Sequence, residues 1–124
     1  MIAILSTYAL SAPAPAAAGS GYLAPYTLVG CTQTGAVAAP RPILPQDECV
    51  KVATFTSFQA GVLTPCAAGK IPSVFAFYND DCTGTSVGGG SLPTSGAPGT
   101  CEEIVLTVDN GAKVGGKAAQ FKCI

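Results

Sequence analysis

The residues of this chain best able to do chemistry are six cysteines, and no histidine accompanies them. Nucleophilic catalysis of the Ser-His-Asp or Cys-His kind needs that histidine, so both are excluded. No Cys-x-x-Cys pair occurs, which argues against a structural zinc site and against thioredoxin-like redox exchange. An even number of widely spaced cysteines in a short chain instead predicts disulfide bonds formed in an extracellular, oxidising compartment. The six are Cys31, Cys49, Cys66, Cys82, Cys101 and Cys123.

The pairing of these cysteines is left open by the sequence, because six cysteines allow fifteen arrangements. The favoured arrangement closes the glycine-rich segment with one bridge and ties the two ends of the chain with another. Each bridge would contribute about 2–4 kcal/mol to stability. The arrangement pairs Cys82 with Cys101, Cys31 with Cys123, and Cys49 with Cys66.

Carboxylates occur as three doublets, Asp47-Glu48, Asp80-Asp81 and Glu102-Glu103. A glycosidase needs two carboxyl groups facing one cleft, about 5–10 Å apart. Neighbouring residues on a strand point to opposite faces of the sheet, so a working pair would have to come from two segments. The doublets are therefore expected to be solvated turn and strand-edge acids, and no catalytic residue is assigned. A small hydrolase using Asp80 and Glu102 is kept as an alternative.

One turn combines an aromatic side chain with several oxygen ligands, in the order Tyr78, Asn79, Asp80 and Asp81. Calcium takes six to eight oxygens, which this turn alone cannot supply, so no metal and no cofactor is predicted. Loops on a rigid scaffold often carry binding residues, and these four residues are the candidate binding surface. Stacking of Tyr22, Tyr26 and Tyr78 on sugar rings would make the protein a cell-wall polysaccharide-binding module, a second alternative.

Charge and hydropathy exclude several classes of partner. Six Lys and Arg stand against seven Asp and Glu, and the basic residues are scattered. Nucleic acid binding needs clustered basic residues, so no nucleic acid partner is expected. No interior segment reaches the roughly 18 uninterrupted apolar residues of a membrane span. The first residues instead resemble export machinery, because a short apolar stretch is followed by small residues and prolines. Residues 1–20 are thus expected to be a signal-peptide-like segment or a Pro/Ala-rich N-terminal arm.

Residues 21–124 are expected to form a single secreted β domain. Strands are predicted over residues 26–29, 49–58, 61–66, 73–78, 103–108, 112–114 and 118–123. Asn110-Gly111 is a strong signal for a two-residue hairpin turn. About six to eight short antiparallel strands favour an all-β fold, a small disulfide-stapled β-sandwich or β-barrel. The expected core consists of the phenylalanines that alternate within the strands: Phe55, Phe58, Phe75, Phe77 and Phe121.

Three features together resemble fungal small secreted cysteine-rich proteins, many of which are effectors or elicitors. The apolar start runs into Ser11-Ala12-Pro13-Ala14-Pro15, and the six cysteines are spread along the chain. An aromatic, acidic and cysteine-containing string over residues 74–84 and the ending Phe121-Lys122-Cys123 complete the likeness. The resemblance implies secretion, an all-β disulfide-bonded fold and action on a plant or microbial partner. It implies no catalytic residues.

These observations favour a binding protein over an enzyme. The first hypothesis is a secreted, monomeric effector or elicitor that binds a host protein or a cell-surface or cell-wall component. Such a protein would trigger plant defence or cell death and would contribute to virulence. The polysaccharide-binding module and the carboxylate-dependent hydrolase remain the alternatives.

Overall fold

The computed structural model describes residues 18–32, 41–107, 111 and 113–124. The predicted export segment therefore lies outside the described residues, except for residues 18–20. Over the described part, no helix is long and apolar enough to cross a membrane. Ten strands occur there: β1 (Ser20–Tyr26), β2 (Ile43–Pro45), β3 (Val50–Phe55), β4 (Ser57–Thr64), β5 (Pro72–Phe77), β6 (Ser86–Gly88), β7 (Glu102–Glu103), β8 (Leu106–Thr107), β9 (Lys113–Val114) and β10 (Gly116–Cys123).

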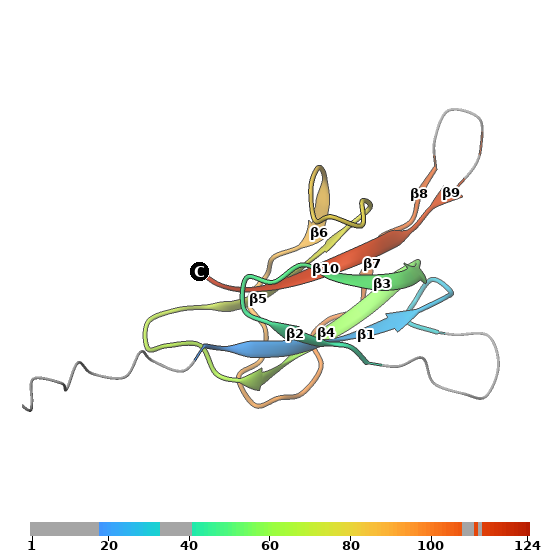
Figure 1. The fold of residues 1–124 in the computed structure, drawn as a ribbon. Helices are drawn as coiled ribbons and strands as arrows, with labels where there is room; N and C mark the ends of the chain where they lie inside the picture. The colour runs from blue at the N-terminus through green and yellow to red at the C-terminus, as the bar shows by residue number, and fades with distance from the viewer. Residues whose placement is uncertain (1–17, 33–40, 108–110, 112) are drawn as a thin grey trace, which may run out of the picture.

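The strands form two four-stranded antiparallel sheets and one small hairpin (Figure 1). Sheet I has the order β2-β1-β4-β7, and sheet II has the order β3-β10-β5-β6. The hairpin β8-β9 pairs Leu106 with Val114 and Thr107 with Lys113, whereas its predicted Asn110-Gly111 turn falls largely outside the described residues. The all-β, antiparallel, disulfide-bonded prediction is confirmed. The strand number exceeds the predicted six to eight because five of the ten have only two or three residues.

The core lies between the two sheets. A bend in the chain at Thr56 directs two phenylalanine rings into it. The chain leaves β3 in sheet II and enters β4 in sheet I through Thr56, so the single strand predicted over residues 49–58 is wrong. On a continuous strand Phe55 and Phe58 would point to opposite faces, because their separation is odd. The bend turns both rings into the core, where they meet edge to face with centroids 5.9 Å apart.

Strand β5 shows why one part of the core prediction fails. Val74 and Ala76 belong to the buried cluster between the sheets. Side chains alternate along a strand, so Phe75 and Phe77 lie on the other face of sheet II. Phe77 is nevertheless buried there, whereas Phe75 is only half-buried. The sequence over residues 73–78 does not alternate between apolar and polar side chains. It therefore does not indicate which face of β5 is buried.

All six cysteines are paired, but none of the three predicted pairs occurs. The long segment after β6 crosses from the edge of sheet II to β7 at the edge of sheet I, so Cys82 and Cys101 end in different places. One bridge, Cys66–Cys123, joins the end of β4 in sheet I to the end of β10 in sheet II. The other two are Cys31–Cys101 and Cys49–Cys82.

Candidate functional site

The predicted binding surface is a turn after β5 that is held by its own side chains. The Asn79 side-chain amide donates to the carbonyl of Thr83 at 3.1 Å. The Asp81 carboxylate accepts from both the backbone N–H and the hydroxyl of Thr83, at 3.2 and 2.5 Å. Tyr78 is half-buried and packs against the core. Asn79 and Asp81 therefore have contacts that shape the turn, whereas the exposed Asp80 carboxylate lies beside Lys51.

The Thr83 contacts of Asp81 predict a pH dependence. The hydroxyl hydrogen bond from Thr83 is the main cause that lowers the pKa of Asp81 below 3.8. A depressed folded-state pKa adds stability above the unfolded value, and that stability is lost as the pH falls through the folded value. An NMR titration of the Asp81 carboxyl carbon should thus show a midpoint below 3.8, and Thr83→Val should raise it. A midpoint at or above 3.8 in the unmodified protein would show that the contact is absent in solution.

The acidic residues do not come together into one site. Asp80 lies beside Lys51, with 4.0 Å between the carboxylate and the ammonium group. Glu102 lies on β7 in sheet I and lines a cavity of about 130 Å³ with Phe58 and the 88–92 segment. Within the described residues, no three His, Cys, Asp or Glu side chains form a group that could hold a metal ion. Asp80 is not among the residues that line the Glu102 cavity.

Tyr22 does not offer an open ring face for stacking on a sugar. Only 9% of its surface is exposed, and its ring lies directly over Gly61 of the neighbouring strand, where a Cβ would collide with it. The guanidinium carbon of Arg41 lies 5.7 Å from the ring centroid. The Tyr26 hydroxyl donates to the Gln59 side chain at 3.1 Å. Through these contacts Tyr22 and Tyr26 stabilise sheet I.

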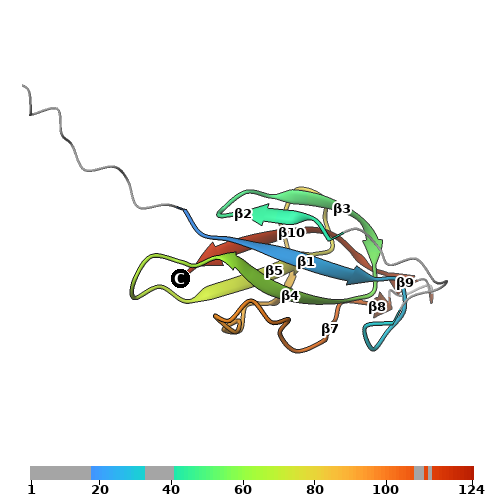
Figure 2. The ribbon, with the colours of Figure 1, turned by 90° about the horizontal axis from the view of Figure 1, so that it is seen from below.

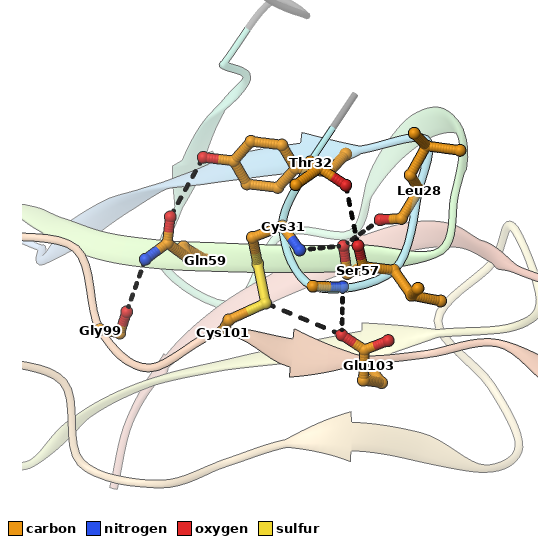
Figure 3. Close-up of a disulfide and its surroundings, with 11 residues drawn as sticks. Leu28, Cys31, Thr32, Ser57, Gln59, Gly99, Cys101 and Glu103 are labelled. Carbon is orange, nitrogen blue, oxygen red and sulfur yellow. Dashed lines mark hydrogen bonds between the residues drawn. A yellow bond between two sulfur atoms is a disulfide. The ribbon is translucent and has the colours of Figure 1, made fainter. Parts of the chain in front are cut away.

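A tightly held turn between β1 and the next described segment is a second exposed feature, which we call the cystine-anchored loop, residues 27–32. Leu28 and Thr32 form an antiparallel bridge, and the Leu28 N–H donates to the Thr32 carbonyl at 3.0 Å. Gly30 and Cys31 both have positive φ values, of 73° and 57°, which close the turn. The bridge Cys31–Cys101 fastens it to the residue before β7 (Figure 3).

Two polar side chains below this loop fix its backbone (Figure 3). The buried Ser57 hydroxyl accepts from the Cys31 N–H at 2.9 Å and donates to the Leu28 carbonyl at 2.5 Å. The Glu103 carboxylate accepts from the Gly30 N–H at 2.8 Å. Its oxygen also lies 3.8 Å from the Cys101 sulfur, which is a contact only, because a disulfide sulfur has no proton to donate. The loop backbone is therefore anchored at Leu28, Gly30 and Cys31.

Replacing Ser57 by alanine should cost about 1–3 kcal/mol of unfolding free energy. The substitution leaves the part-buried Cys31 N–H and Leu28 carbonyl without their shared partner. Chemical unfolding measures the loss, and amide exchange at Cys31 should accelerate. The matched control is Ser86→Ala on the exposed strand β6, which should change stability by less than about 0.5 kcal/mol. Equal stability of the two variants would contradict the anchoring role.

The anchored loop presents two apolar side chains to solvent. Leu28 is 45% exposed and Val29 is 57% exposed. Ordinary surface turns carry polar residues and glycine, so a fixed turn with a Leu-Val tip is a candidate binding feature. Sequence reasoning placed residues 26–29 in a strand and missed the loop, although the Val29-Gly30-Cys31 run carries the glycine of a turn beside a cysteine.

The comparisons with known proteins found no relative: no family model, no curated protein and no solved structure matches this chain.

Proposed function

We propose that this protein is a secreted binding protein of the effector or elicitor type, which engages a host or cell-surface target through the cystine-anchored loop. The proposal is carried by one observation: Leu28 and Val29 are exposed on a turn fixed by Cys31–Cys101, Ser57 and Glu103. A preorganised apolar tip loses little conformational entropy on binding, which favours affinity.

Secretion is supported by the three disulfides. Bridges of this kind form and persist in extracellular compartments and are rare in reducing ones. All six cysteines are paired, so no free thiol remains for catalysis or metal binding. The fungal origin and the plant host come from the resemblance described above and are part of the proposal.

The test is infiltration of purified protein into leaves. The oxidised protein should trigger a defence or cell-death response, and the reduced and alkylated protein should not. Leu28→Ser/Val29→Ser should abolish the response while the protein stays folded. Ile71→Ser is the control, because Ile71 is 49% exposed, like Leu28, but lies beside the C-terminal residue Ile124.

Several results would overturn this proposal. An equal response to the alkylated protein would show that the folded loop is not what is perceived. A full response to Leu28→Ser/Val29→Ser would remove the loop as the binding surface. No response to any sample would reject the elicitor activity, and retention on chitin or β-glucan would then favour the polysaccharide-binding alternative.

A further inference from the structure

A groove of about 310 Å³ runs along one side of β3, next to the cystine-anchored loop. One wall is the end of β1 and the start of the loop, at Pro25, Tyr26 and Thr27. The other wall is β3 itself, over residues 51–55, and Arg41 and Pro42 close one side. Prolines, Val52, Ala53 and Phe55 make most of this lining apolar. The groove has the volume of a small ligand site.

The β3 wall of the groove is a sheet edge. Among the described strands, β3 is the outer strand of sheet II, and its one partner is β10 (Figure 2). Its register pairs Phe55 with Gly116 and Lys51 with Ala118, and it shifts between these two pairs. The intervening residues 52–54 thus have no Cα partner on the side that faces β10, and the opposite, outer side of β3 pairs with no described strand. An outer strand of this kind has backbone N–H and C=O groups to offer to an added strand.

The charges at the groove are basic. Arg41 and Lys51 line it, and none of its described lining residues is a carboxylate. Arg41 stacks on Tyr22 and has no ion-pair partner among the described residues. Within the described residues, the ion-pair partner of Lys51 is Asp80, at 4.0 Å, with the two side chains 77% and 65% exposed, so that pair is weak. Residues 33–40, which precede Arg41 in the sequence, contain no Asp or Glu that could neutralise it.

We infer that this groove binds an extended peptide segment carrying acidic side chains, which pairs with the free edge of β3. The inference rests on the proposed binding function and names the chemistry of its partner. Backbone hydrogen bonds to residues 52–54 would supply affinity without sequence preference. The groove would select segments that place carboxylates near Arg41 and Lys51 and apolar side chains between those carboxylates. A protein partner fits better than a polysaccharide because the wall is a strand edge and not an aromatic platform.

The probe is a capped octapeptide of alternating valine and glutamate, titrated into the full-length oxidised protein and followed by amide NMR shifts. Shifts should concentrate at Val52, Ala53 and Thr54 and saturate with peptide concentration. Three comparison probes share the test: the same peptide with lysine for glutamate, the same peptide N-methylated at alternate residues, and oligogalacturonate. All three should bind at least about tenfold more weakly, because each lacks either the charge or the backbone donors.

Charge variants of the protein complete the experiment. Arg41→Gln/Lys51→Gln should raise the Kd of the valine–glutamate peptide about tenfold. Lys70→Gln is the matched control, because Lys70 is exposed on the β4–β5 loop and does not line the groove, and it should leave the Kd unchanged.

The proposal is overturned by absent shifts at residues 52–54, by equal binding of the N-methylated or lysine peptide, or by tighter binding of oligogalacturonate. Its failure is distinguishable from failure of the proposed function. A leaf response without peptide binding removes the groove alone, and peptide binding without a leaf response removes the elicitor activity alone.

Discussion

Replacing Cys31 and Cys101 together by alanine is expected to lower the free energy of unfolding by about 3–4 kcal/mol. The bridge spans a sequence separation of 70 residues, so breaking it releases a long loop in the unfolded chain. In the folded state the structural change is confined to the loop, because Ser57 and Glu103 also hold it. Urea unfolding, followed by far-UV circular dichroism, measures the change.

The control for this variant is the double alanine substitution of Cys49 and Cys82. Their separation is only 33 residues, but loop entropy grows with the logarithm of length, so the loss should be smaller by less than about 1 kcal/mol. If removing Cys31–Cys101 changes stability by less than about 1 kcal/mol, the bridge does not constrain the chain as described. Leaf activity of the Cys31 and Cys101 variant should fall more than that of the Cys49 and Cys82 variant, because only the Cys31–Cys101 bridge fastens the loop that carries the apolar tip.

Truncating Phe121 to alanine should cost about 3–5 kcal/mol, the second large effect. The ring is fully buried between the sheets, and it fills the space that side chains at Gly19 and Gly21 would occupy. Alanine leaves a cavity that strands on both sides cannot close without shifting. Denaturant unfolding measures the loss, and the variant should remain all-β at low denaturant because the disulfides persist.

Phe75→Ala is the matched control for Phe121. Phe75 lies on the adjacent strand β5, where its Cα partner in β10 is Gln120, the residue before Phe121. It is on the outer face of sheet II and only half-buried. Its truncation should cost clearly less than that of Phe121, because less apolar surface leaves the protein interior. Equal losses would contradict the assignment of Phe121 to the buried face of sheet II and of Phe75 to its outer face.

The sequence predicts the fold class because alternation and turn residues act locally. It does not predict the phase of β5, since Val74, Phe75, Ala76 and Phe77 are all apolar and either face could be buried. The strand break at Thr56 is equally hidden, because it depends on backbone bonds to Tyr26 and Ile104.

The candidate site was harder to predict than the fold. The contacts that fix the loop join residues 26 and 73 positions apart, Cys31 to Ser57 and Gly30 to Glu103. No local pattern encodes such pairs. The predicted disulfide pairing is wrong for the same reason. Which cysteines pair depends on which sheet each long segment reaches.

Mapping the disulfides of the purified, non-reduced protein by mass spectrometry is the most direct test of the fold and of the loop anchored in it. Trypsin should leave residues 1–51 joined to residues 71–113, and residues 52–70 joined to residues 123–124. Cleavage after Glu48 separates Cys31 from Cys49. Residues 83–100 contain no Lys, Arg, Asp or Glu, so thermolysin, cutting before Val87, is needed to separate Cys82 from Cys101.

A Cys31 peptide joined to a Cys101 peptide is the predicted result, together with Cys49–Cys82 and Cys66–Cys123. A link between residues 1–51 and 52–70, or an internal Cys82–Cys101 bridge, would contradict the sheet arrangement and the anchored loop together.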